Sequence, residues 1–412
     1  MSKVNKFVYN LCTWGIGLIL VINFRSVYSV IPLWDGKISM SSLLGLSIFS
    51  VILLIINGNS SLSKKNVYIL MISFIYLVMY IFLQPGGRRD YINLALPLLI
   101  FIVLGIMVGS KFLVEILKKY SYLMVFIAVV SLVFWVFGSQ LKLLPITGYK
   151  PIFWGTYHSV PSYFDVYFET QESSFSNLLS FSLIRNSAIF TEAPMASINF
   201  CIAFGTLLLL DKNKNIKKLV ILALAVLSTM SVTGYIYLAG IVALNYAYVE
   251  NSNSQISKLI KYSILPFIVV GIFVMSKKLV LQKTMGISGT LRLDDFRVLK
   301  ETWYIHPWLG SGLGNTQILF RVMPYWRIRQ NLTAIANSIT TVWTNGGLYL
   351  MAVYIVPVIV GIVNSIKNKN YKKLIFIIGF VYLFVITISP YRYLTLLCLA
   401  MFLTNGDKVR NK

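Results

Sequence analysis

Two segments of this 412-residue chain carry side chains suited to binding phosphate. Arg185 and Glu192 stand just before an apolar run, and five arginines lie between positions 292 and 329. A guanidinium is a planar fork that grips a phosphate by two parallel hydrogen bonds, whereas an ammonium is a point charge. Each such charge-assisted bond contributes roughly 1.5–3 kcal/mol. These segments predict a site for a phosphate or pyrophosphate group. The alternative is a basic loop resting on anionic lipid headgroups.

The stretch around the first arginine also has a plain structural interpretation. Glu192 in the first turn of a helix suits the helix dipole, and Pro194 is common at a helix start. A capped helix end is therefore the alternative to a functional role for this segment. A charge placed at the mouth of a spanning helix must nevertheless face protein or water.

Residues 290–305 are predicted to form an amphipathic helix. Apolar residues recur at steps of three, three and four from Leu293 to Trp303, which is helical spacing. Such a helix would lie in the membrane interface and hold its arginines at phosphate depth. A solvated face with intrahelical pairs such as Arg297–Glu301 is the alternative.

Other patterns predict structure more than chemistry. The glycines of 310–315 are expected to form a tight turn and not a nucleotide loop, because no strand precedes them and no Lys-Ser/Thr follows. Asp294-Asp295 alone is a weak metal signal. The two histidines, His158 and His306, lack the carboxylate pattern of a zinc site. We expect no metal and no cofactor.

The elements that must position these groups are membrane-spanning helices. Hydrophobic residues make up 57% of the chain and charged residues 12%, and the mean hydropathy is +0.75. An ordinary soluble domain is about 25% charged. The composition therefore excludes a soluble globular protein, a disordered chain and a collagen-like fibre, and it predicts a polytopic membrane protein.

The predicted fold class is all-α, with about 12 transmembrane helices, since a spanning helix needs about 20 mainly apolar residues. The pair 218–232 and 235–250 is either a hairpin broken at Thr233-Gly234 or one kinked helix. The predicted spans are 7–24, 38–57, 66–83, 91–109, 120–138, 193–210, 218–232, 235–250, 260–276, 337–363, 373–389 and 391–404.

The charge of the short loops predicts the orientation. With the N-terminus in the cytoplasm, the inner segments hold twenty basic residues and the short outer loops hold five. Because basic residues accumulate on cytoplasmic loops, both termini are expected to be cytoplasmic. The chain then forms a single integral membrane domain, 1–412, with two long outer loops, 139–191 and 277–336, that contain interfacial helices.

The two types of basic residue divide between the two sides. The predicted inner set contains nineteen lysines and one arginine, and the outer set contains the other ten arginines. The second long loop carries nine cations and three acids, whereas the first carries three of each. One loop is therefore expected to attract anions and the other is not.

Five motifs in sequence resemble those of the O-antigen polymerase and ligase superfamily. Arg185-x-x-x-Ile-Phe-x-Glu-x-Pro194 resembles its Arg…Phe-x-Glu-Pro motif before a spanning helix. Ser288-Gly-Thr-Leu-Arg292, His306-Pro, Gly310-x-Gly-x-Gly-Asn315 and Asn337…Asn345-Gly-Gly347 resemble its signature loop. The match covers about 185–350. Ligases of that superfamily have His where this chain has Ala336, which favours a Wzy-type polymerase.

The resemblance implies a glycosyltransferase in the bacterial inner membrane. It would polymerise undecaprenyl-pyrophosphate-linked repeat units into O-antigen or a related surface polysaccharide on the outer face. Its partners would be the lipid-linked donor and acceptor, membrane lipid and a chain-length regulator protein, with no nucleic acid. Arg185 and Arg292 are expected to clamp the pyrophosphate, and Glu192, with His306 in reserve, to deprotonate the acceptor. The expected further substrate contacts are Arg297, Arg321, Arg327, Arg329 and Asn337.

Two other functions fit parts of the sequence. A ligase shares the chemistry but attaches the glycan to a lipid core. A lipid-linked oligosaccharide flippase or another transporter also often has twelve spans, but transporters place charges near the midplane and often show two similar halves. The predicted helices have almost no charge at mid-span.

Overall fold

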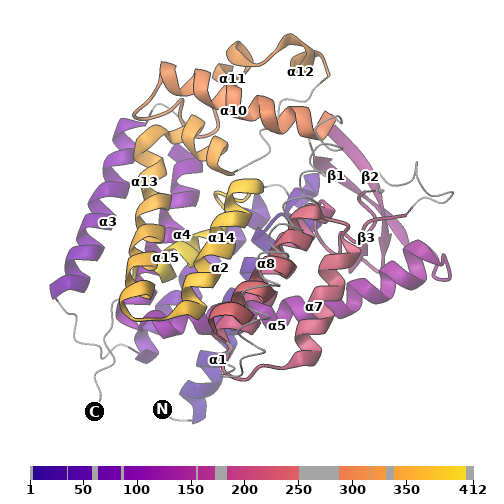
Figure 1. Cartoon of the computed structure of the whole chain (residues 1–412), viewed down its shortest axis with the longest axis horizontal. Coiled ribbons are helices and arrows are strands. Elements are labelled where there is room, and N and C mark those ends of the chain that lie inside the picture. The colour runs from indigo at the N-terminus through magenta and orange to yellow at the C-terminus, as the bar shows by residue number, and fades with distance from the viewer. Residues whose placement is uncertain are drawn as a thin grey trace.

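The computed structural model describes residues 3–34, 36–57, 64–84, 88–154, 156–171, 183–249, 287–315, 317–330 and 338–404. Every apolar run predicted to span the membrane corresponds to a helix, except 260–276, which lies outside the described residues. The long helices are α1 Lys3–Asn23, α2 Lys37–Asn57, α3 Lys64–Leu83, α4 Arg88–Met107, α5 Ser110–Phe134, α6 Ala193–Gly205, α7 Ile216–Ser228, α8 Val232–Tyr248, α10 Ile287–Ile305, α13 Ser338–Lys367, α14 Tyr371–Ile386 and α15 Tyr393–Leu403 (Figure 1).

The helices indicate a multi-pass membrane protein. Among the described residues, seven helical stretches are long and apolar enough to cross a membrane. Two of them include a π-helical extension, η3 Trp135–Gln140 after α5 and η5 Thr206–Leu210 after α6. Helices α7, α8, α14 and α15 are apolar but shorter. The count of twelve spans stays a prediction.

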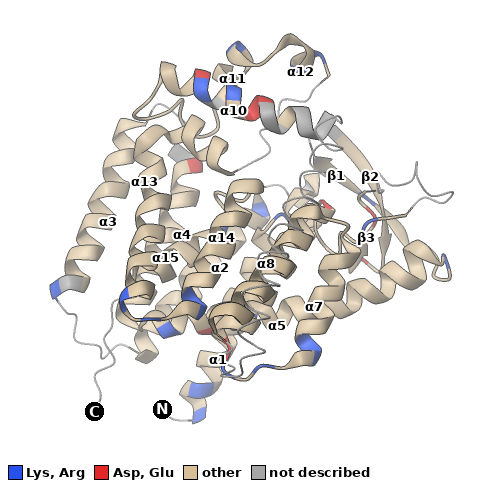
Figure 2. Ribbon diagram, in the orientation of Figure 1, with Lys and Arg blue, Asp and Glu red and all other residues tan. Residues whose placement is uncertain are grey.

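Charged residues collect at two opposite ends of the bundle. At one end, Tyr9 near the start of α1 donates a hydrogen bond to Glu115 near the start of α5, at 2.7 Å. At the other end, Arg392 before α15 donates to the carbonyl of Asn23, the last residue of α1, at 3.2 Å. We call the first the lysine end, because α1 and α3 begin there with lysines and α7 has Lys217 and Lys218 in its first turn. We call the second the arginine end. Figure 2 shows the separation.

The core surrounds α6 and α15. Nearly every residue of both helices is buried, as expected for helices that are apolar on all sides. By contrast, α2 and α3 expose large apolar side chains, such as Ile55 at 76% and Phe82 at 79%. Exposed apolar surface of this extent is typical of a lipid-facing helix.

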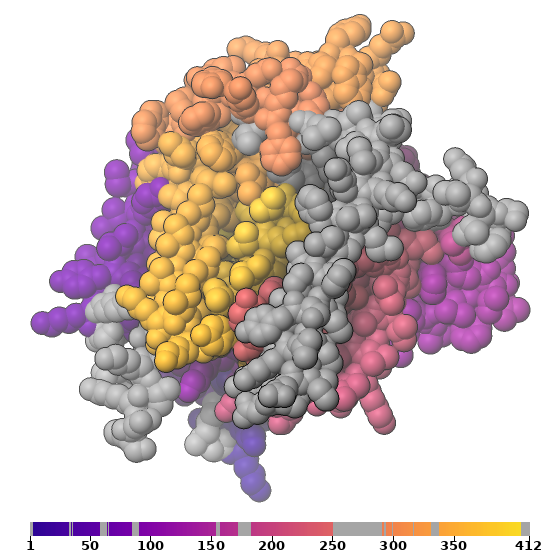
Figure 3. All heavy atoms as spheres, in the orientation of Figure 1, coloured from indigo at the N-terminus to yellow at the C-terminus, as the bar shows by residue number. Residues whose placement is uncertain are grey.

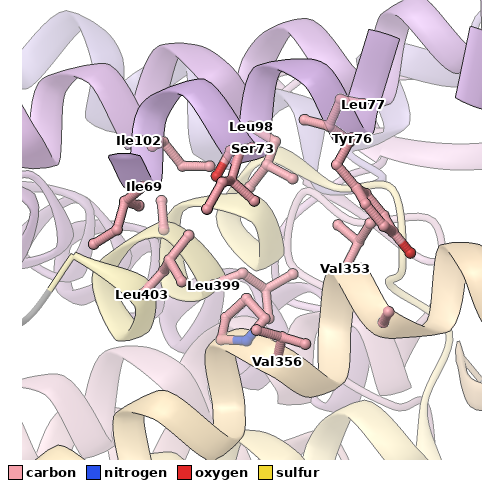
Figure 4. A pocket seen from close by; sticks show the side chains of 14 residues that line it. Ile69, Ser73, Tyr76, Leu77, Leu98, Ile102, Val353, Val356, Leu399 and Leu403 are labelled. Atoms are coloured by element: carbon pink, nitrogen blue, oxygen red, sulfur yellow. The ribbon is translucent and has the colours of Figure 1, made fainter. Parts of the chain in front are cut away.

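Helix α3 packs loosely on the rest of the bundle. Only 11% of its spanning stretch is buried, against 89% for α6. An apolar hollow of about 320 Å³ separates it from α4, α13 and α15 (Figure 4). Ile69, Ser73 and Tyr76 line it from α3, and Val353 and Leu403 line it from α13 and α15.

The first long loop is not all-α, so that expectation is wrong for residues 148–168. It forms an antiparallel sheet of three strands, β1 Gly148–Trp154, β2 Thr156–Tyr163 and β3 Tyr167–Phe168. The segment is rich in aromatic residues that favour strands, and Pro151 and Pro161 disfavour a helix. Ile152 and Val160 face inward, where they pack with the 3₁₀ turn η1 Val27–Val30 that follows α1.

The second long loop contains the predicted amphipathic helix. Helix α10 includes the whole of 290–305, and two short helices follow it, α11 Gln317–Val322 and α12 Tyr325–Arg329. Figure 3 shows these three helices as a layer over the arginine end. Their place in a membrane interface stays a prediction.

The short helices α7 and α8 form the hairpin that was one of the two predicted options. The break is not at Thr233-Gly234, which lies inside α8, but at residues 229–231. Met230 adopts a left-handed conformation there, with φ 50°. Tyr235 crosses back and donates a hydrogen bond to the carbonyl of Leu227 at 2.9 Å.

Candidate functional site

The segment from Arg185 to Glu192 has a turn at Ala188-Ile189 and is held in place at the arginine end. It pairs with the chain after α1, because Val27 N–H donates to Ile189 O at 2.8 Å and Thr191 N–H donates to Arg25 O at 3.1 Å. Buried Asn186 fixes its other side by hydrogen bonds to Ser131 and Ser228. These contacts join α1, α5 and α7 around the segment, so its side chains have fixed positions.

Arg185 lies against the end of α7. Its Nε donates to the carbonyl of Thr229 at 2.9 Å, and Nη2 donates to that of Met230 at 3.4 Å. Among the described residues, Nη1 has no hydrogen-bond partner. Burial lowers the pKa of Arg185, and the neighbouring Tyr235 and Glu192 oppose that shift. The guanidinium is thus anchored on one edge, with donors remaining on the other.

Glu192 precedes α6 but does not cap it through its side chain. The first N–H of the helix, from Ala193, is instead accepted by Oε1 of Gln171 at 3.2 Å. The expected helix cap is therefore supplied by a different residue. The Glu192 carboxylate acts electrostatically on both Arg185 and Arg25.

Arg25 and Arg392, which were not among the predicted site residues, lie close to the segment that carries Arg185 and Glu192. Arg25 adopts a left-handed conformation with φ 56°, which is uncommon outside glycine. Burial and the nearby charge of Arg392 lower the pKa of Arg25, whereas Glu192 raises it. We call Arg25, Arg185, Arg392 and Glu192 the arginine cluster. Arg25 and Arg185 share one carboxylate and Arg392 adds a third cation near Arg25, so the cluster has an excess of positive charge that favours a bound anion.

A cavity of about 430 Å³ with both polar and apolar walls adjoins the cluster. It lies between the sheet and the start of α6, and Glu192 is part of its wall. His158 on β2 and Glu169 after β3 also line it. The histidine of the Glu192 cavity is therefore His158, whereas His306 is exposed at the end of α10. The β-hairpin that brings His158 here was the element missing from the predicted fold.

The arginines of the second loop divide into paired and exposed groups. Buried Arg327 donates from Nη1 to Asp294 at 2.8 Å and to Asp295 at 3.1 Å. Arg297 pairs with Asp294 and, as the alternative interpretation expected, with Glu301, each at 2.8 Å. The Arg327 pairs fasten α12 to α10, whereas those of Arg297 lie within α10. Arg321 and Arg329 are exposed.

Two predicted site residues fall outside the described parts. The backbone of Arg292 belongs to α10, but its side chain is not among those described, and Asn337 lies in the undescribed stretch 331–337. Asp294-Asp295 is engaged by arginine, and no group of three metal-ligating side chains occurs among the described residues.

The glycines after α10 form the predicted tight turn. Gly310, Gly312 and Gly314 all have positive φ, and the turn packs its backbone directly on α13. A side chain on Gly310 would come within 2.4 Å of Gly346 N. Ser311 N–H also donates to the carbonyl of Thr344 at 2.8 Å. The motif therefore docks the second loop on α13.

No family model matches the chain, and no curated protein matches it. The functional assignment therefore depends on the site itself. The structure combines the arginine cluster with an adjacent cavity of about 430 Å³, and the two share Glu192.

Proposed function

We propose that the protein is a glycosyltransferase that polymerises oligosaccharide repeat units carried on undecaprenyl pyrophosphate. The observation that carries the proposal is the arginine cluster, in which Arg25 and Arg185 interact with Glu192 and Arg392 lies near Arg25, beside a cavity that Glu192 lines. An arginine group of this kind suits a diphosphate. The shared carboxylate suits the proton transfer that accompanies attack by a hydroxyl.

The reaction follows from these two parts. An acceptor sugar hydroxyl attacks the anomeric carbon of the donor glycan, and a new glycosidic C–O bond forms. The bond from that carbon to the pyrophosphate oxygen breaks, and its electron pair leaves with undecaprenyl pyrophosphate. Glu192 takes the hydroxyl proton. Arg25, Arg185 and Arg392 stabilise the charge that develops on the leaving group.

The proposal includes the location of the site. The arginine end would face the outside of a bacterial inner membrane, both termini would be cytoplasmic, and about twelve helices would span the bilayer. The donor is activated by its own pyrophosphate, so the transfer requires no nucleotide. The lysine end would rest on the anionic inner leaflet, for which a point charge suffices.

The test is a product ladder from purified protein and one lipid-pyrophosphate-linked repeat unit, without nucleotide. Wild-type protein should convert single units into a ladder of longer chains. Arg25→Ala, Arg185→Ala and Arg392→Ala should each remove the long chains while single units persist. Lys37→Ala is the matched control, because it removes an exposed cation at the same end, from the first residue of α2. Normal ladders from the arginine variants would refute the proposal.

A further inference from the structure

We propose that the cavity beside β2 is the binding subsite for the acceptor sugar, and that it takes an uncharged, hydroxyl-bearing ring. That the sugar is the acceptor of the reaction rests on the proposed function. That the cavity binds a neutral sugar rests on the residues that line it. At about 430 Å³, the cavity falls within the range of about 300–1,000 Å³ that is usual for small-molecule sites.

Glu169 offers one fixed acceptor. Its Oε1 receives hydrogen bonds from the hydroxyls of Ser139 and Tyr163, each at 2.7 Å. Its Oε2 has no partner among the described residues. Two donors thus hold the carboxylate in one orientation, and the second oxygen is left for a ligand hydroxyl. A hydroxyl bound to a carboxylate forms a short, strong hydrogen bond.

Gln171 offers one fixed donor two residues further on. Its Oε1 accepts a hydrogen bond from the first N–H of α6. This bond sets the orientation of the amide, so Nε2 is the atom left to donate to a ligand. Within the described part of the chain, Nε2 has no partner. A fixed donor beside a fixed acceptor matches a sugar, whose hydroxyls both donate and accept.

The rest of the wall favours a neutral ring over an anion. Ile152, Val160 and Pro161 form an apolar side that can cover the C–H face of a sugar. Glu169 and Glu192 place two carboxylates in the same cavity, and like charge disfavours an anionic ligand. The diphosphate would therefore stay at the arginine cluster and the sugar in the cavity, with Glu192 between them.

Two near-isosteric variants test the subsite. Glu169→Gln keeps an oxygen for Ser139 and Tyr163 but turns the other oxygen into a donor. Gln171→Glu keeps the acceptor for Ala193 but turns the donor into an acceptor. The probe is the repeat-unit oligosaccharide of the producing cell, freed from lipid pyrophosphate by mild acid. Its binding to full-length protein in nanodiscs is measured by saturation-transfer NMR.

Wild-type protein should bind the probe saturably, and each variant should bind it about tenfold more weakly or worse, because a hydrogen bond to a charged group is involved. The thermal midpoint should stay unchanged. The matched control is Glu115→Gln, since Glu115 also accepts from a tyrosine hydroxyl, that of Tyr9, but at the lysine end. The same probe with its primary hydroxyls oxidised to carboxylates should bind more weakly than the neutral probe.

Three results would overturn the inference: no binding to wild-type protein, wild-type affinity in both variants, or equal affinity for the oxidised probe. The product ladder is read separately. A ladder without Glu169-dependent sugar binding would leave the transferase proposal standing and remove the subsite. Sugar binding that depends on Glu169 and Gln171 without a ladder would support the subsite and remove the transferase proposal.

Discussion

At the scale of single residues, two of the four members of the arginine cluster could be predicted from the sequence. Arg185 and Glu192 could be selected because they stand seven positions apart before one apolar run. Arg25 and Arg392 could not, because they lie far away in the chain and come near each other, and Arg25 near Glu192, only where α1 ends and α15 begins. The signal that could have selected them is that both are arginines. A short outer loop that needs only a positive charge could equally carry lysine.

Glu192→Gln should lower the rate of chain extension by about 10²–10⁴, the usual contribution of a general base. The stability cost should be about 1 kcal/mol, because Arg25 and Arg185 lose a countercharge but α6 loses no side-chain cap. The measurements are the rate of ladder formation and the thermal midpoint. Glu192→Asp is the control, since it keeps the charge and shortens its reach. A wild-type rate for Glu192→Gln would rule out the proton-transfer role.

Arg327→Ala should be strongly destabilising, although Arg327 was predicted as a substrate contact. Its removal leaves buried Asp295 without this cation, whereas Asp294 keeps Arg297. Breaking a buried pair in this way costs about 3–5 kcal/mol. Arg329→Ala, on the same short helix but exposed, should stay within about 0.5 kcal/mol. Thermal unfolding of both variants makes the comparison. Equal midpoints would show that the ion pairs do not fasten α12.

At the scale of elements, apolar length predicted the helices and failed for the sheet. Helices such as α1 and α13 follow directly from runs of about 20 apolar residues. The hairpin of β1 and β2 gave no such signal, because its strands are short and their prolines interrupt the usual pattern of a strand. The predicted break between α7 and α8 was placed at Gly234, which the helix tolerates. The chain instead turns at Met230, whose left-handed conformation its residue type does not indicate.

Gly347→Ala should loosen the second loop from α13. Gly347 has φ 55° inside that helix, and an added Cβ would lie 2.6 Å from the backbone of Trp308. Backbone strain and overpacking together should cost about 2–5 kcal/mol. The measurement is the thermal midpoint together with hydrogen exchange of residues 306–315, which should accelerate.

The control for that variant is Gly240→Ala in α8, where an added Cβ meets nothing within 4 Å. Because alanine favours a helix over glycine, this change should be neutral or stabilise the protein by up to about 1 kcal/mol. If the two alanine variants unfolded at the same temperature, the turn at Gly310 could not be what holds the second loop on the bundle.

At the scale of the whole molecule, the charges agree with a protein that has two chemically different ends. Lysines begin α3 and α7 at one end, and the arginine cluster lies at the other. The sequence predicted this division from loop charges alone, because alternating helices place every second loop on the same side. The packing of the helices does not show which end faces the cytoplasm. That prediction follows from the rule that basic residues accumulate on cytoplasmic loops.

Cysteine labelling determines the orientation, on which the proposed chemistry depends. The three native cysteines are buried, so new ones can be read against a low background. Tyr157→Cys on β2 and Tyr325→Cys on α12 place thiols at positions exposed by 74% and 77%, and Ile216→Cys does so at the start of α7, exposed by 74%. An impermeant maleimide should label the first two in intact spheroplasts and the third only after permeabilisation. The opposite pattern would put the arginine cluster in the cytosol, where a glycan already carried across the bilayer cannot reach Glu192.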